Sequence, residues 1–158
     1  MDLALFQAYV DDFEQTIQDD QWQRLAQYFT HNAEYRLPDE SVVVRGRDQI
    51  LKILKQAVHN FDRLMDGHEY RTVEGPIVRN GEIFRDWSSR FSLRGAPDFV
   101  FEGQTMAVTD GDQIKLLQIT ATPESLAIFR SWIELHGYLL RDRRNHQKLN
   151  STVRSRAA

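Results

Sequence analysis

Residues 68–121 read HEYRTVEGPIVRNGEIFRDWSSRFSLRGAPDFVFEGQTMAVTDGDQIKLLQITA. Two dipeptides in this stretch, Asn80-Gly81 and Asp110-Gly111, are strong signals for two-residue hairpin turns, because a type I′ turn needs positive φ at both central residues. A longer turn, Arg-Gly-Ala-Pro-Asp, lies between them at 94–98. The stretch therefore predicts a meander of four antiparallel strands, and strands of this length favour a curled sheet. We place the strands at 68–79, 82–93, 99–109 and 113–121.

Three amphipathic helices are predicted before this sheet. In the first, apolar residues recur at alternating steps of three and four, as on the core-facing side of a helix. These residues are Leu3, Phe6, Val10, Phe13 and Ile17. Asp20 is a good N-cap for a second helix over about 22–29, and a third helix is expected over about 47–65. Two short strands are expected between the second and third helices, at 33–37 and 42–44.

The order of these elements, helices first and sheet second, is typical of an α+β domain whose helices lie on one face of an antiparallel sheet. Because a strongly twisted sheet backed by helices leaves a cone with an open mouth, we expect a pocket of the kind that binds small ligands. The chain has 158 residues, enough for one domain with a substantial core. We place that domain at 1–140, including a further helix over 122–140, and a basic tail at 141–158.

The charge is distributed unevenly along the chain. The formal net charge is −3, yet residues 141–158 contain six Lys or Arg and one Asp, a net of +5 that leaves −8 on the remainder. An acidic body argues against nucleic acid as the main partner. The basic tail either grips an anionic surface or is a solvated terminus, and we favour the second interpretation.

The composition excludes several classes of protein. The chain has no cysteine, so it has no disulfide, thiolate nucleophile or Cys-bound zinc. No apolar run approaches the ~20 residues of a membrane span, and the N-terminus lacks the pattern of a signal peptide. We therefore expect a cytoplasmic protein without a membrane partner. No metal-ligand spacing, phosphate loop, dinucleotide fingerprint or nucleophile elbow is present, so neither a metal nor a cofactor is expected.

The predicted order of elements resembles the NTF2-like superfamily, and within it the SnoaL-like group. The likeness rests on five segments: WQRLAQYF at 22–29, NAEY at 32–35, RGRDQI at 45–50, NGE at 80–82 and DGDQI at 110–114. It covers residues 1 to about 121. The resemblance implies a cone-shaped pocket and a homodimer that covers the outer face of the sheet. It implies no single activity, because the superfamily includes isomerases, dehydratases, hydrolases, oxygenase small subunits and non-catalytic binders.

Two kinds of enzyme with this fold give expectations for individual residues. Ketosteroid isomerases carry a Tyr and a catalytic Asp at positions that correspond here to Phe13 and Leu37, and apolar side chains cannot perform that proton transfer. Scytalone dehydratase is more similar locally. Its Asp-Tyr-Arg stretch resembles Glu34-Tyr35-Arg36 and its pocket His corresponds to His68, but its Tyr–Asp pair has no counterpart at Gln15-Thr16.

His68 and Asp86 are the candidate catalytic residues. An imidazole with a pKa of roughly 6.5 exchanges protons near neutral pH. The resemblance implies that Phe84 and Asp86 point into the cone, where Asp86 would pair with His68, raise its pKa and fix its tautomer. The alternatives are that His68 is a surface residue at a strand entrance, and that Asp86 lies on a solvated outer face and pairs with an arginine.

The expected pocket lining is aromatic, which suits a flat, partly apolar molecule such as an aromatic or polycyclic compound. The residues are Tyr9, Phe13, Trp22, Tyr35, Phe84 and Trp87. Tyr35 either binds a ligand oxygen or is a core residue whose hydroxyl bonds to the backbone. The working hypothesis is a cofactor-free lyase or isomerase that uses acid/base proton transfer. The alternatives are a non-catalytic binding or structural module, and an accessory small subunit of a larger enzyme such as a ring-hydroxylating oxygenase.

Overall fold

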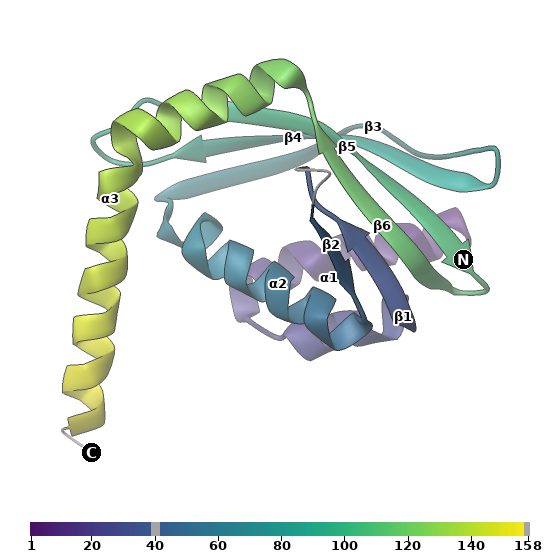
Figure 1. The fold of residues 1–158 in the computed structure, drawn as a ribbon, viewed down its shortest axis with the longest axis horizontal. Coiled ribbons are helices and arrows are strands. Elements are labelled where there is room, and N and C mark those ends of the chain that lie inside the picture. The colour runs from purple at the N-terminus through teal and green to yellow at the C-terminus, as the bar shows by residue number, and fades with distance from the viewer. Residues whose placement is uncertain (39–41, 157–158) are drawn as a thin grey trace.

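The computed structural model describes residues 1–38 and 42–156, with side chains described for 1–38 and 42–146. Figure 1 shows helices packed beneath a curved sheet and a long C-terminal helix at one end of it. The elements are α1 (Leu3–Asp19), the 3-10 helix η1 (Trp22–Tyr28), β1 (Phe29–Arg36), β2 (Val43–Arg45), α2 (Arg47–Asn60), the 3-10 helix η2 (Asp62–Leu64), β3 (Gly67–Arg79), β4 (Glu82–Ser92), β5 (Phe99–Asp110), β6 (Gln113–Ala121) and α3 (Pro123–Arg156).

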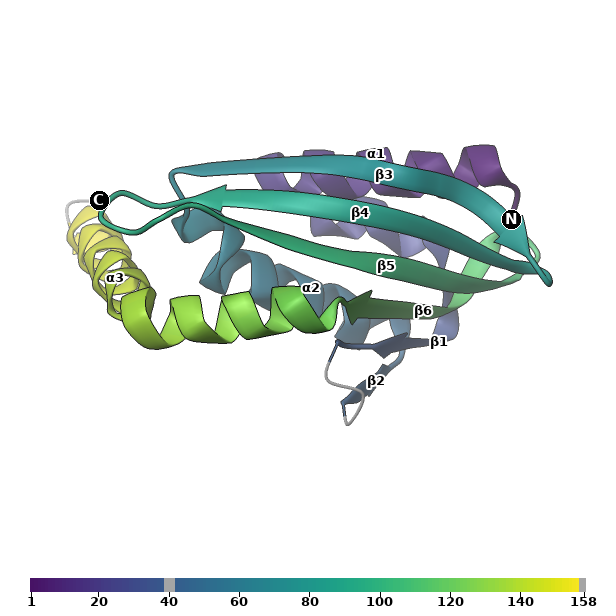
Figure 2. The ribbon, with the colours of Figure 1, turned by 90° about the horizontal axis from the view of Figure 1, so that it is seen from above.

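The strands form one six-stranded sheet in the order β2-β1-β6-β5-β4-β3. The predicted meander is confirmed, because β3, β4, β5 and β6 pair in sequence and antiparallel. The sheet is nevertheless mixed, since β1 pairs with β6 in parallel. Figure 2 shows the long strands curving over α1 and α2. The α+β class, the curved sheet, the N-terminal helices and the C-terminal helix are thus as the sequence predicts.

The two dipeptide turns differ in detail. Asn80 and Gly81 have φ values of 53° and 81°, so both central residues are left-handed, as a type I′ turn requires. At the second turn Gly111 has a φ of 55°, whereas Asp110 is not left-handed. A register shift between Val108 and Thr109 accompanies this second turn. Both hairpins form, but only the first one has the predicted turn geometry.

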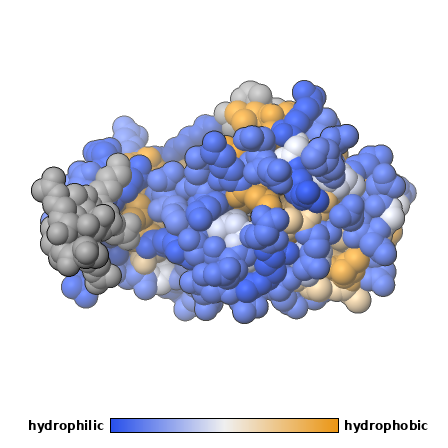
Figure 3. Space-filling model, turned by 90° about the horizontal axis from the view of Figure 1, so that it is seen from below, coloured by the Kyte–Doolittle hydropathy of each residue, from blue (hydrophilic) through white to orange (hydrophobic). Residues whose placement is uncertain are grey.

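The hydrophobic core has two parts. The larger part joins α1, α2, β1 and β6 through side chains that are buried completely or almost so: Phe6, Leu25, Phe29, Ile50, Ile114 and Leu117. The smaller part lies beneath α3, where Trp132 packs with Leu64, Phe91 and Phe99 and donates from Nε1 to the carbonyl of Pro97 at 2.9 Å. The first half of α3 therefore covers one end of the sheet. Figure 3 shows that the opposite, helical side of the molecule is mainly hydrophilic.

The residues predicted as a basic tail continue α3, which extends to Arg156. Figure 1 shows α3 changing direction part-way along and running down past α2. Arg143 donates to the carbonyl of Leu64 at 2.9 Å and to the carboxylate of Asp66 at 2.8 Å. These contacts attach the beginning of the predicted tail to the turn before β3.

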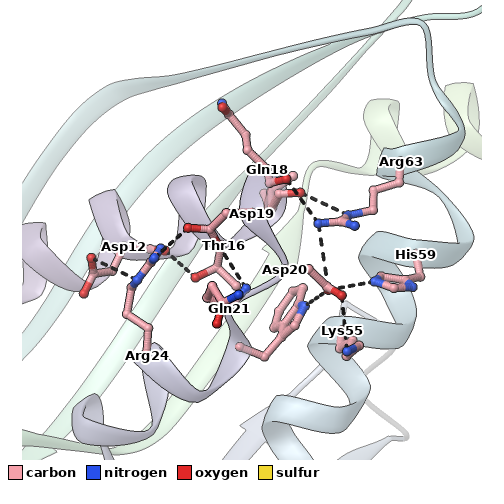
Figure 4. A network of polar contacts seen from close by, with 12 residues as sticks. Asp12, Thr16, Gln18, Asp19, Asp20, Gln21, Arg24, Lys55, His59 and Arg63 are labelled. Carbon is pink, nitrogen blue, oxygen red and sulfur yellow. Dashed lines mark hydrogen bonds and ion pairs between the residues drawn. The ribbon is translucent and has the colours of Figure 1, made fainter.

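A cluster of polar residues around Asp20 joins the end of α1 to α2 (Figure 4). The Asp20 carboxylate accepts from Trp22 Nε1 at 2.6 Å and contacts His59 Nε2 at 2.8 Å. Lys55 and Arg63 lie 3.4 Å and 3.8 Å from it. Asp20 has a left-handed φ of 63° and is the C-cap of α1, so the expectation that it caps the next helix is wrong. The Asp20 carboxylate instead contacts the Trp22 indole and three basic side chains on α2 or just after it.

Candidate functional site

A cavity of about 360 Å³ lies between the concave face of the sheet and the helices α1 and α2. This volume is within the range of small-molecule sites. Most of its wall is apolar, with aromatic rings from α1, the end of α2, the sheet and α3. The aromatic residues without a polar group are Phe6, Phe13, Phe61, Phe91, Phe101 and Phe129. Polar side chains interrupt this wall. Ser89 and Thr105 contribute single hydroxyls, and the others form two groups.

The structure brings five of the eight predicted site residues to the cavity wall: Tyr9, Phe13, Tyr35, His68 and Trp87. The other three lie elsewhere. Trp22 packs edge-on behind Phe13, with ring centroids 6.3 Å apart, and its indole is fixed by Asp20. Phe84 and Asp86 lie on the outer face of β4. The aromatic lining is thus supplied in part by residues that the sequence did not single out, mainly on β4, β5 and α3.

The two faces of β4 explain this difference. Arg85, Trp87, Ser89 and Phe91 all line the cavity, so the odd-numbered residues point inward. Asp86 points outward, where its carboxylate accepts from Gln104 Nε2 at 2.7 Å. The expected pairing of Asp86 with His68 is therefore wrong, and so is the expectation of an arginine partner for Asp86. The apolar residues on the odd-numbered face were the signal for the correct orientation, because successive side chains alternate between the faces of a strand.

The first polar group in the cavity is a histidine–carboxylate pair. His68 Nδ1 lies 3.5 Å from Asp62 Oδ1, and both side chains are less than a fifth exposed. The His68 ring stacks on Phe91, with centroids 4.4 Å apart and planes within 10°. Within the described part of the chain, Nε2 of His68 is buried and has no hydrogen-bond partner. The pair therefore belongs to the cavity wall, with its imidazole stacked on an apolar ring.

Burial changes the proton affinity of both groups in this pair. Desolvation raises the pKa of the Asp62 carboxyl from 3.8 to about 6, against a hydrogen bond from its own backbone. Desolvation also lowers the pKa of the His68 imidazole below its usual value of 6.5. At neutral pH the imidazole is consequently neutral, beside a carboxyl that titrates close to neutrality. Paired groups with shifted pKa values in a cavity are typical of acid/base sites.

Sequence reasoning missed Asp62 for a structural reason. It extended the third helix to about residue 65, which places Asp62 one turn beyond His59 on a solvated side. The helix α2 ends at Asn60, and Phe61 turns the chain so that η2 begins at Asp62. This turn brings Asp62 under the start of β3. No residue type at 61 marks a helix end, because Phe61 is neither a Gly nor a Pro.

The second polar group surrounds Arg85, whose side chain is only 4% exposed. Its Nε donates to Thr72 Oγ1 at 2.8 Å and its Nη1 to the Tyr70 hydroxyl at 2.7 Å. Glu14 Oε1 lies 3.8 Å from Nη2. The three phenols of this region line the same cavity as Arg85, and they are Tyr9, Tyr35 and Tyr70. We call Arg85 and these phenols the arginine–tyrosine cluster.

Burial keeps the phenols of this cluster protonated. Desolvation raises the pKa of Tyr35 and of Tyr70 to about 12. The pKa of Tyr9 is raised further, first by desolvation and then by Tyr35 and Tyr70, against the opposing effect of Arg85. The three hydroxyls are therefore neutral groups that can donate hydrogen bonds to a ligand oxygen at any physiological pH.

Solved structures with the same architecture are known, although no protein-family model and no curated protein matches this chain. An NTF2-like protein of unknown function from Exiguobacterium sp. has a TM-score of 0.60, with 13% identity, over 75% of this chain and 98% of its own. A hypothetical protein with a ketosteroid isomerase-like fold from Catenulispora acidiphila, in complex with trimethylamine, has a TM-score of 0.55, with 15% identity, over 74% and 87%. The fold is NTF2-like.

A third structure with this NTF2-like fold is TerC, co-crystallised with polyporic acid. Its TM-score is 0.60, with 8% identity, over 80% of this chain and 96% of its own. Identities of 8 to 15% show the fold alone. The SnoaL-like grouping and the local similarity to scytalone dehydratase therefore stay predictions. The matched NTF2-like structures leave a fifth to a quarter of this chain uncovered.

Two features are absent from the described residues of this chain. No cluster of three or more His, Asp or Glu side chains in that part of the chain is arranged to hold a metal ion. None of the helices in the same part combines the length and the apolar character that crossing a bilayer would need.

Proposed function

We propose that this protein binds a small, partly apolar molecule in its NTF2-like cavity and that His68 exchanges a proton with that molecule. One observation carries the proposal: Nε2 of His68 is buried in the cavity wall without a partner, next to a carboxyl group whose pKa is raised to about 6. The other NTF2-like structures with bound small molecules support the coarser part of the proposal, since one holds trimethylamine and another polyporic acid.

The chemistry of the pair follows from its protonation state. A neutral imidazole at Nε2 accepts a proton from an acidic C–H or O–H of the bound molecule. The resulting imidazolium is stabilised by the Asp62 carboxylate, whose Oδ1 lies 3.5 Å from Nδ1. The imidazolium then returns the proton to a different atom of the same molecule, which is an isomerisation, or to a departing hydroxyl, which is a dehydration. Asp62 replaces Asp86 as the positioning residue in this proposal.

A non-catalytic binding protein is the second candidate function. The distance of 3.5 Å between Nδ1 and Oδ1 favours it, because a hydrogen bond that fixes the imidazole is shorter. Catalytic hydrogen bonds are often long in ligand-free proteins and tighten in the complex, so this distance is also compatible with catalysis. The two candidates differ in whether protons are transferred to and from the bound molecule.

Deuterium exchange into the bound molecule tests the proposal. Mass spectrometry first identifies the molecule that co-purifies with the chain, and the same molecule is then incubated with the protein in heavy water. We expect incorporation of deuterium at carbon, slowed about 10²–10⁴-fold in His68→Gln. His31→Gln is the matched control, because His31 is exposed. A ligand that gains no carbon-bound deuterium would establish the non-catalytic candidate, and equal exchange by His68→Gln would assign the base to another residue.

We also propose a homodimer that covers the outer face of the sheet. Val73 and Val100 are 60% and 41% exposed on the long strands β3 and β5, where a second copy would bury them. The expected result of sedimentation at micromolar concentration is a dimer, and Val100→Glu on this surface should shift it toward the monomer. A compact monomer of the unchanged chain would contradict the proposal.

A further inference from the structure

Among the described residues, Arg85 is a buried cation without a closely bound anion. Its side chain is 4% exposed, and a buried charge is costly unless it is paired and hydrogen-bonded. The two oxygens that accept from Nε and Nη1, on Thr72 and Tyr70, belong to neutral hydroxyl groups. The carboxylate of Glu14 is 43% exposed, and its nearest oxygen lies 3.8 Å from Nη2, beyond hydrogen-bond distance. The compensation of this charge inside the protein is therefore incomplete.

Arg85 lines the cavity and has one unused donor. Nη2 is buried and has no hydrogen-bond partner among the described residues, whereas buried donors in proteins are almost always satisfied. Thr72 and Tyr70 fix the guanidinium plane through its other two nitrogens, so the directions of the Nη2 hydrogens are set before any ligand arrives. A preorganised donor of this kind binds an anionic oxygen without losing side-chain entropy.

The groups around Arg85 add hydrogen-bond donors, and among the described residues no anion lies closer to it than Glu14. Tyr9, Tyr35 and Tyr70 line the cavity with Arg85, and their phenols remain protonated. Desolvation also raises the pKa of Glu14, despite the opposing effect of Arg85. Burial thus disfavours the ionised form of Glu14, the carboxyl group nearest to Arg85.

We propose that the molecule bound in the cavity carries an anionic oxygen, a carboxylate or a comparably acidic hydroxyl, on an apolar body, and that this oxygen accepts hydrogen bonds from Nη2 of Arg85. The proposal rests on the proposed function to the extent that the cavity binds a small molecule. This contact with Arg85 also orients the bound molecule. Tyr70 lies between the two polar groups, with its hydroxyl 2.7 Å from Arg85 and its ring centroid 6.4 Å from that of His68. The anionic end is held at Arg85 and the remainder extends toward His68.

Two fluorescent probes with the same skeleton test this inference. Anilinonaphthalene sulfonate carries an anionic group that stands in for a carboxylate, and N-phenylnaphthylamine is its neutral counterpart. We expect Arg85→Met to weaken binding of the anionic probe at least about tenfold, as for the loss of a hydrogen bond to a charged group. Binding of the neutral probe should change by less than about twofold. Arg90→Met is the matched control, because Arg90 is 59% exposed on the outer face of the same strand and pairs with Asp98.

A second variant keeps the test valid if Arg85→Met does not fold. Glu14→Gln leaves Arg85 in place and removes the only carboxylate near Nη2 among the described side chains, so it should tighten binding of the anionic probe and leave the neutral probe unchanged. Displacement of the neutral probe by the anionic one checks that both occupy the same cavity. Equal losses of both probes in folded Arg85→Met, or an unchanged anionic probe in Glu14→Gln, would overturn the inference. If neither probe bound the unchanged chain, the proposed function would fail instead.

Discussion

A Gly103→Ala variant is expected to melt roughly 10 °C below the unchanged chain. Gly103 lies in β5 opposite Ala121 of β6, and a methyl group at this position would collide with the carbonyl oxygen of Thr120 and approach Trp87 Cζ2 to 2.7 Å. The backbone of β6 cannot retreat without breaking its ladder with β5. Overpacking of this kind costs about 3 kcal/mol, which in a chain of this size corresponds to several degrees per kcal/mol.

Gly137→Ala is the matched control for this prediction. Gly137 lies inside α3, and a methyl group there would be 3.5 Å from Ile133 Cγ2, an ordinary contact. Because alanine is a better helix former than glycine by about 1 kcal/mol, this variant should melt at the same temperature or slightly higher. Thermal unfolding followed by circular dichroism measures both. A similar response of the two variants would mean that the close approach of β5, β6 and Trp87 is not what requires glycine at 103.

Replacing Asp62 with Asn is expected to stabilise the protein at neutral pH and to leave its stability unchanged near pH 4. The pKa of Asp62 is raised from 3.8 to about 6, so the folded state holds this proton more tightly than the unfolded state does. The carboxyl therefore costs no stability below pH 3.8, and its cost grows between pH 3.8 and about 6 and is complete above that. A shift of this size corresponds to at most about 3 kcal/mol, which Asn removes because it has no charge to desolvate.

His68 has the opposite pH dependence. Burial lowers its pKa below 6.5, so its neutral form is the stable one in the folded state, and stability is lost as the pH falls through that value. His68→Gln should consequently gain stability at acidic pH and not at neutral pH. Urea unfolding between about pH 4 and pH 8 separates the two variants. If Asp62→Asn were destabilised at pH 7, the pair would be an ion pair in which each charge supports the other.

The sequence predicted the architecture because the signals for it are local. The Asn80-Gly81 turn, the helical spacing of Leu3 to Ile17 and the order of the elements depend on residues that are close along the chain. The fold follows from these signals even though identities to solved NTF2-like structures are 8 to 15%. One pairing was missed, that of β1 and β6 in parallel, because about half of the chain separates the two strands.

The polar groups of the cavity were predicted only in part. His68 and Tyr35 were identified from their residue types and positions, but the partner of His68 depends on where α2 ends, and no Gly or Pro marks that point. Arg85 was overlooked because arginines are rarely buried without an ion partner. Its hydrogen-bond acceptors, Tyr70 and Thr72, come from β3, whose register with β4 shifts immediately after Thr72. Such an irregularity has no clear signature in a single sequence.

The alternation of side chains along β4 has a consequence for how this cavity could diversify. Arg85 and Asp86 are adjacent, and they stand on opposite faces of the strand. The sign of the charge inside the cone thus depends on whether the number of residues between the Asn80-Gly81 turn and this point is odd or even. One residue more in that interval would turn Arg85 outward and Asp86 inward, and it would turn Trp87 and Phe91 outward as well, so the charge of the cone and its aromatic wall are tied to the same register.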